Sequence, residues 1–193
     1  MSKNLRRTAL KIIPHVPWGT HFCQFYRNKD DLVEILVPYF RAGLESNEYC
    51  MWITAEPLDE ESAREAIRTA MPRFDRYLQK GQLEIIPHDR WYLRGGVFDL
   101  QTVLHDWIDK LQHALEQGYE GLRVAGNAAW LEGNDWESFT EYEAAVNRVI
   151  GGYRMIAVCS YHLGRCGAAA LGDVLKSHQF ALVRRPPEWA VVA

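Results

Sequence analysis

The chain has 193 residues, of which 48% are hydrophobic and 24% are charged, so a single globular domain with a sizeable core is expected. Its formal net charge of -3 excludes a general electrostatic attraction to nucleic acid. An apolar signal region and an apolar run of the roughly 18 residues needed to cross a bilayer are both missing. The sequence therefore predicts a cytoplasmic protein without direct membrane or nucleic-acid contacts.

Strand and helix patterns alternate from the start of the chain. Residues 21–26 (HFCQFY) are rich in strand-forming side chains, and Asp30 and Asp31 then offer the start of a helix. Pro38 lies inside this helical pattern and is expected to kink the helix or to remove one hydrogen bond. Residues 49–54 (YCMWIT) form a short apolar run typical of a strand covered on both faces.

The middle of the chain continues the alternation. A helix is predicted over 57–70 and a third strand over 83–87, followed by a long loop over 88–98. Asp99 is expected to cap the clearest helix, which Gly118 ends.

The last third of the chain has the same character. Its predicted elements are a strand over 121–126, a helix opened by Asn134 or Asp135, a strand over 155–161, a short helix over 168–178 and a strand over 180–184. Such alternation predicts an α/β fold with a mainly parallel sheet and helices on both faces. We expect an N-terminal segment (1–14) with a solvated basic cluster, one domain (15–185) and a loose C-terminal tail (186–193).

Ligands of open α/β sheets bind outside the carboxyl ends of the strands, and this rule selects candidate site residues. The candidates are Tyr26, Arg27, Glu56, Arg90, Trp91, Tyr92, Asn127, Trp130, Tyr161 and His162. This mixture of aromatic and charged side chains favours a pocket for a small organic effector over a phosphate cradle. The alternative interpretation is ordinary packing at the ends of loops.

The predicted loop 88–98 combines aromatic and basic side chains with a flexible joint at Gly95 and Gly96. It could close over a ligand as a lid. In the alternative interpretation, Trp91 and Tyr92 only cover the edge of the sheet.

Metal and catalytic chemistry have weaker support. His21 and Cys23 point to the same face of one predicted strand, and Cys159 and His162 could join them if their strands are neighbours. Core residues with ordinary partners are the favoured interpretation, so no metal and no cofactor are predicted. The chain contains no GxSxG, HExxH or CxxC motif, and no catalytic residue is assigned. Cys23, Cys50 and Cys159 lie in apolar runs, which favours reduced, buried thiols.

Four stretches, in this order, carry a family resemblance: WGTHFCQFYRNKDDLVEILVPYFRAGLESNEYCMWIT, GLRVAGNAAW, EYEAAVNRVI and CSYHLGRCGAAALGDVLKSHQF. Together they resemble the MEDS domain, a sensory domain named after methanogens, methylotrophs and the regulator DcmR. The resemblance implies a signalling input module that senses a small molecule. It also implies a signalling partner of the histidine kinase, anti-sigma or transcription-regulator type, and allows for a homo-oligomer. Family patterns carry Gly-Glu-Met-Ser-Trp after the fourth strand, whereas this chain has Gly126 to Trp130 without the glutamate.

The MEDS domain is also similar to degenerate RecA/KaiC-type ATPases. A phosphate loop needs GxxxxGK[ST], but residues 26–31 contain no glycine and add two carboxylates. Glu56 resembles the glutamate that positions water in such enzymes, while Asn127 stands where a Mg²⁺-holding aspartate is expected. The sequence therefore predicts a non-enzymatic sensory or relay domain. Two alternatives remain: a nucleotide-binding protein without hydrolysis, using Arg27 or Arg90 in place of the lysine, and an enzyme of unknown class.

Overall fold

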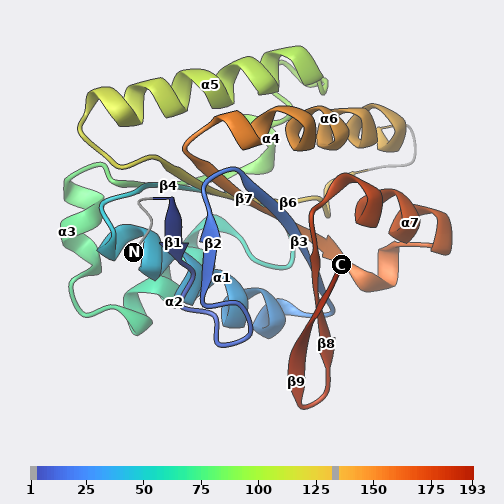
Figure 1. Ribbon diagram of the computed structural model, residues 1–193, viewed down its shortest axis with the longest axis horizontal. Helices are drawn as coiled ribbons and strands as arrows, with labels where there is room; N and C mark the ends of the chain where they lie inside the picture. The colour runs from blue at the N-terminus through green and yellow to red at the C-terminus, as the bar shows by residue number, and fades with distance from the viewer. Residues whose placement is uncertain (1–3, 132–134) are drawn as a thin grey trace.

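In the computed structural model, which describes residues 4–131 and 135–193, a twisted sheet forms the centre of the molecule (Figure 1). Among the described residues this sheet has seven strands in the order β5-β4-β6-β7-β3-β8-β9, and β9 is antiparallel to its neighbour. The strands are β3 (Thr20–Tyr26), β4 (Tyr49–Thr54), β5 (Leu83–Pro87), β6 (Leu122–Asn127), β7 (Met155–His162), β8 (Ala181–Arg185) and β9 (Glu188–Val192). The predicted mainly parallel α/β architecture is thus confirmed.

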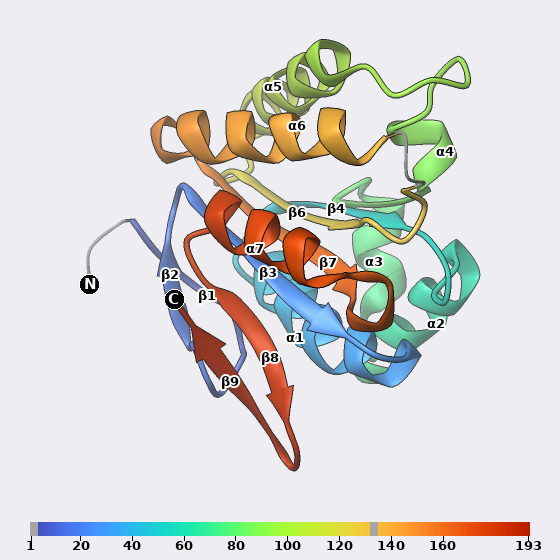
Figure 2. The ribbon, with the colours of Figure 1, turned by 90° about the vertical axis from the view of Figure 1, so that its right-hand side faces the viewer.

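Helices cover both faces of the sheet (Figures 1 and 2). One face carries α1 (Lys29–Glu45), α2 (Glu60–Ala70) and α3 (Phe74–Gln79), and the other carries α4 (His88–Trp91), α5 (Leu100–Glu116), α6 (Trp136–Val149) and α7 (Ala168–Ser177). Because side chains alternate along a strand, β3 sends Phe22 into the first layer and His21 and Cys23 toward the second. Each face therefore has its own hydrophobic core.

The topology creates a switch point beside β3. Strand β3 continues through α1 on one face to β4, whereas β7 continues through η2 (Leu163–Arg165) and α7 on the other face to β8. Strands β3 and β7 are parallel neighbours, so their connections leave the same edge in opposite directions. A crevice is expected where connections diverge in this way.

Several local predictions hold in detail. Asp99 caps α5 by accepting a 2.7 Å hydrogen bond from the backbone N–H of Thr102, and Gly118 follows the helix with a φ of +82°. Asp135 occupies the cap position of α6, while the alternative start at Asn134 lies outside the described residues. Helix α1 continues past Pro38, which has no backbone N–H to donate within the helix.

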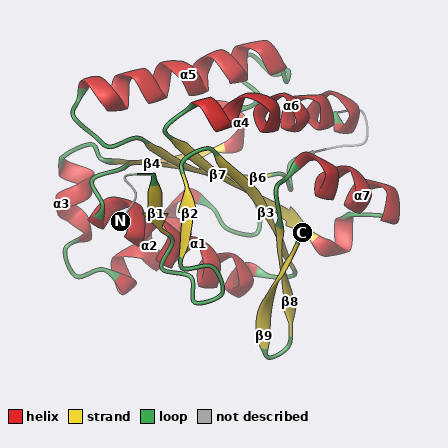
Figure 3. Cartoon of the chain, in the orientation of Figure 1, coloured by secondary structure: helices red, strands yellow, loops and turns green. Residues whose placement is uncertain are grey.

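Other local predictions were wrong. The segment 88–98 does not begin as a loop, since α4 forms its first turn and buries Trp91. Helix α3 was missed, because six residues are too few for a helical period to be recognised. The C-terminal tail is not loose: β9 pairs with β8 and builds the hairpin that projects in Figure 3.

The N-terminal segment was predicted to be solvated, but it forms a strand and contacts the rest of the domain. Its strand β1 (Leu5–Arg7) pairs with β2 (His15–Pro17), and the Arg6 guanidinium donates to Glu48 at 2.7 Å. Glu48 is fully buried and also accepts from Arg123, at 2.5 Å. The N-terminus therefore closes one side of a buried ion-pair network. No helix in the described part of the chain is long and apolar enough to cross a membrane.

Candidate functional site

A crevice lies at the carboxyl edge of the sheet, at the switch point beside β3. It has a volume of about 390 Å³ and is bordered by the turns that follow β3, β4, β6 and β7. Its lining residues are Tyr26, Arg27, Asn28, Lys29, Glu56, Pro57, Ala129, His162 and Arg165. Four of the predicted site residues, Tyr26, Arg27, Glu56 and His162, are thereby brought together.

In the turn between β3 and α1, two backbone N–H groups donate to side chains of the turn itself and are therefore not available to a ligand. The Asp31 carboxylate accepts a 2.9 Å hydrogen bond from the Arg27 N–H, and the Asn28 side chain accepts one of 3.0 Å from the Asp31 N–H. Asp31 is also buried, with 5% of its surface exposed. A phosphate loop would direct such amides at an anion. Here a built-in carboxylate takes that position.

Asn127 forms the floor of the crevice. Its Oδ1 accepts from the Tyr26 hydroxyl at 3.0 Å and from the Ala129 N–H at 3.0 Å, while its Nδ2 donates to the Ala55 carbonyl at 3.1 Å. Burial raises the pKa of Tyr26 to about 12, so the hydroxyl remains a neutral donor. The side chain at the position of a metal-holding aspartate thus ties three strand ends together.

The charged side chains that line the crevice are mainly cationic, with Glu56 as the carboxylate. The His162 ring meets the Tyr26 ring edge-on with centroids 5.3 Å apart, and its buried Nδ1 has no hydrogen bond in the described structure. The Arg165 guanidinium donates to the Ala129 carbonyl, which fixes one cation beside the opening. The Arg27 side chain is exposed and makes no ion pair with any described residue.

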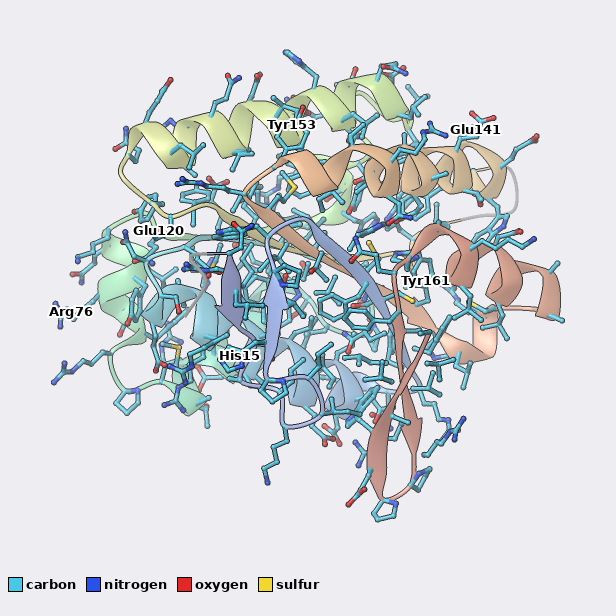
Figure 4. All side chains as sticks on the ribbon, viewed as in Figure 1. His15, Arg76, Glu120, Glu141, Tyr153 and Tyr161 are labelled. Atoms are coloured by element: carbon cyan, nitrogen blue, oxygen red, sulfur yellow. The ribbon has the colours of Figure 1, made fainter. Side chains whose placement is uncertain are left out.

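The remaining predicted site residues lie elsewhere. Trp91 is buried against Trp107 with ring centroids 4.4 Å apart, and Tyr92 stacks on Trp130 at 5.4 Å within the α5–α6 core. Arg90 lines an open groove between α4 and α5. Tyr161 lies inside the molecule beside α7, whereas Arg76 and Glu141 point outward (Figure 4). The aromatic side chains other than Tyr26 therefore pack in the core and do not line the crevice.

A second polar group lies under α6 and α7, away from the crevice. It joins His21 of β3, Cys159 of β7, Glu143 of α6 and His178, which follows α7, with one ligand-type atom of each within 4.8 Å of the others. His21 and Cys159 were weak metal candidates, and Cys23 lies opposite Cys159 in the strand register but outside this group. His162 points to the crevice instead.

Glu143 and His178 were missed from the sequence, although one signal for Glu143 was present. It stands between Phe139 and Val146 at helical spacing, so a carboxylate falls on the buried face of α6. A charged residue there requires a buried partner, which could have directed attention to the histidines.

The ionisation of this group is set by burial and by mutual contacts. Burial opposes the charge on Glu143, but the nearby His178 and His21 outweigh it and hold the pKa of Glu143 well below its usual range. Burial and His178 lower the pKa of His21, against the effects of Glu143 and Asn147. Burial, followed by the Glu143 carboxylate, raises the pKa of the Cys159 thiol. One buried carboxylate, two imidazoles and one thiol are therefore in mutual contact.

The fold is that of the KaiC-like proteins. A KaiC-like protein from Pyrococcus horikoshii OT3, PH0186, superposes with a TM-score of 0.65 at 13% identity, covering 96% of this chain and 85% of that one. The flagellar accessory protein FlaH from Methanocaldococcus jannaschii gives a TM-score of 0.59 at 10% identity, covering 96% and 84%. At such identities the likeness concerns the fold alone.

The family is defined by the sequence. The family model of the MEthanogen/methylotroph, DcmR Sensory domain (MEDS) matches residues 20–179, and the chain belongs to this family. No curated relative matches the sequence. The recognition of a MEDS domain on a KaiC-like scaffold is confirmed, and with it the general class of sensory domains.

Proposed function

We propose that this chain is a non-enzymatic sensory domain that binds a small organic effector with an anionic group in the crevice at the carboxyl edge of the sheet. The family supports a sensory role, and the volume of about 390 Å³ falls within the range of small-molecule sites. The decisive observation is the contrast between two sets of donors. The turn amides are taken by Asp31 and Asn28, whereas the Arg27 guanidinium is available at the opening.

The expected binding mode follows from the lining residues. An organic acid would place its carboxylate between Arg27 and Arg165, because guanidinium groups bind carboxylates in a bidentate manner. Its apolar part would lie against the Tyr26 and His162 rings. A triphosphate fits less well, since Asp31 and Glu56 repel it and no glycine lets the backbone approach it.

The experiment begins with native mass spectrometry of the purified chain, which detects a co-purified small molecule. Short-chain organic acids are then titrated while tryptophan fluorescence is recorded, because half-buried Trp130 adjoins Ala129 of the crevice. We expect Arg27→Ala to weaken binding at least tenfold. Arg148→Ala on the exposed surface of α6 is the matched control and should leave affinity unchanged. Equal affinities in both variants would place the effector elsewhere.

Nucleotide binding without hydrolysis is the second candidate, favoured by the KaiC-like fold alone. It predicts that ATP displaces the organic acid and that Arg27→Ala abolishes ATP binding. Isothermal titration with ATP and with the organic acid separates the two functions. The partner protein that would read occupancy, of histidine kinase, anti-sigma or transcription-regulator type, remains a prediction.

A further inference from the structure

The buried group of His21, Glu143, Cys159 and His178 has the dimensions of a coordination shell. The His21 Nε2 lies 3.1 Å from Glu143 Oε2 and 3.4 Å from Cys159 Sγ. The same Glu143 oxygen lies 3.3 Å from His178 Nε2 and 3.5 Å from Cys159 Sγ. Four ligands around Zn²⁺ at bonds of about 2.0–2.3 Å form a tetrahedron with edges of about 3.3–3.7 Å. Three of these four separations fall in that range and the fourth, at 3.1 Å, is slightly shorter. The remaining two of the six edges, from His178 to His21 and to Cys159, are shorter than 4.8 Å.

The hydrogen bonds around His178 leave its Nε2 available for a metal. The Nδ1 of His178 lies 2.7 Å from the Val174 carbonyl, and only a protonated Nδ1 can donate to that oxygen. In the neutral form of the ring, Nε2 then carries the lone pair that a metal would bind, and this atom lies 3.3 Å from Glu143 Oε2. Histidine ligands of metals are oriented by such a backbone carbonyl at the opposite ring nitrogen.

Other atoms of the group also lack the partners that a buried polar atom requires. Glu143 Oε1 and His21 Nδ1 make no hydrogen bond among the described residues, and the side chains of both residues are almost completely buried. Polar atoms buried without partners are rare and require an explanation. A cation at the centre would bind Oε2 of this carboxylate and Nε2 of each imidazole, so it accounts for the unpaired Nε2 of His178 but not for Glu143 Oε1 or His21 Nδ1.

The charges of the site balance for a divalent cation. Binding forms bonds from the metal to one nitrogen of each histidine, to a Glu143 oxygen and to the Cys159 sulfur, while the thiol proton leaves to solvent. The carboxylate and the thiolate supply two negative charges, which neutralise the metal in a core that would not tolerate net charge.

From this geometry we propose that His21, Glu143, Cys159 and His178 form a tetrahedral site for Zn²⁺ or a similar borderline-soft divalent cation. Its four ligands come from β3, α6, β7 and the residue that follows α7. The ion would therefore connect the adjacent strands β3 and β7 to the helices α6 and α7, which pack on this face of the sheet. Four protein ligands, three of them buried and Cys159 half-buried, are consistent with a structural zinc site without an open position. The site is separate from the crevice and does not share any of the residues that line it.

The probes are Zn²⁺ and Co²⁺, added to the full chain after removal of metal with a chelator. We expect one equivalent of Zn²⁺ per chain by elemental analysis, a higher melting temperature, and for Co²⁺ the visible bands of a tetrahedral site with a thiolate charge-transfer band. Cys159→Ser should remove the charge-transfer band and lower affinity at least about tenfold, the lower end of what loss of even an outer-shell partner costs. Cys166→Ser, a half-buried thiol outside the group, is the matched control and should bind as the wild type does.

Circular dichroism reports whether each variant folds. If Cys159→Ser does not fold, the wild-type Co²⁺ spectrum and the variants Cys23→Ser, Cys50→Ser and Cys166→Ser decide. A thiolate band that persists in all three of these variants belongs to Cys159. The proposal is overturned if the wild-type chain takes up no metal, if the Co²⁺ spectrum lacks the thiolate band, or if Cys159→Ser and Cys166→Ser bind equally.

Discussion

Gly43 leaves the space that the side chain of Arg123 occupies. A Cβ atom at position 43 would lie 2.6 Å from both Cδ and Nε of Arg123, closer than real Cβ atoms approach other atoms. The guanidinium cannot retreat easily, since it donates to Glu48, to the Tyr39 carbonyl at 3.0 Å and to the Arg7 carbonyl at 2.8 Å. A glycine in α1 thus makes room for a buried charge from β6.

Gly43→Ala should consequently lower the free energy of unfolding by about 1–3 kcal/mol, the usual cost of overpacking. Urea denaturation measures the change. The matched control is Gly172→Ala in α7, where a Cβ meets nothing within 4 Å. There the change should stabilise by about 0.5–1 kcal/mol through the better helix propensity of alanine. A neutral Gly43→Ala would show that Arg123 adapts without loss.

Arg123→Met removes one partner of the buried Glu48 and should destabilise by about 3–5 kcal/mol. The double variant Arg123→Met, Glu48→Leu should lose less than the sum of the two single changes, because no carboxylate is then left buried. Arg64→Met, which breaks the partly exposed pair with Glu60, should cost less than about 0.5 kcal/mol. Additive losses in the double variant would contradict the coupling.

Asn127→Asp should destabilise although it restores the residue type of an ATPase. The amide donates to the Ala55 carbonyl, and a carboxylate there would set two acceptors against each other. The expected cost is about 1–3 kcal/mol, as for a buried group left without its partner. Thermal or urea unfolding gives the value. Gln112→Glu on the exposed face of α5 is the control and should leave stability nearly unchanged. An unchanged stability of Asn127→Asp would refute the role of Nδ2.

The chain should show no ATP hydrolysis above background, because the backbone N–H groups of Arg27 and Asp31 bind the side chains of Asp31 and Asn28, and Asn127 stands where a Mg²⁺-holding aspartate is expected. Phosphate release is measured with and without Mg²⁺. A Mg²⁺-dependent rate of phosphate release that disappears in Glu56→Ala would contradict this prediction.

Thiol reagents should modify Cys166 well before Cys23 or Cys50, which are fully buried. Burial raises the pKa of Cys166, so less of its reactive thiolate exists at neutral pH than in an exposed cysteine. Cys166 should therefore react more slowly at pH 7 than a free thiol does. Its reaction rate should continue to rise with pH above the pKa of an ordinary thiol. Loss of the fast phase in Cys166→Ser checks the assignment, and its persistence would assign it to another cysteine.

The sequence predicted the sheet well, because each buried strand is a short apolar run and each long helix has one clear apolar face. Asp99 is a case in which local chemistry alone fixes a helix start. The tail was mispredicted for the opposite reason: β9 is half-exposed and depends on pairing with β8, a tertiary contact without a local signal.

The candidate residues were chosen by their place after strands, and this rule locates an edge without giving the direction of a side chain. Tyr161 pairs with Phe25, the residue before Tyr26, so both tyrosines lie near the same end of adjacent strands. Tyr26 nevertheless faces the crevice, whereas Tyr161 faces the core beside α7. His178 follows a helix and not a strand, so the rule could not select it. Only the assembled fold brings it to Glu143.

Asp31 has a consequence for what the domain can report in a cell. ATP is abundant in living cells, and a KaiC-like crevice that still held triphosphate would be filled at nearly all times. In the function proposed above, a carboxylate that belongs to the chain itself, fixed by the Arg27 N–H, would exclude that competitor before any effector binds. Occupancy of the crevice would then vary with a scarcer molecule and be independent of the energy state of the cell.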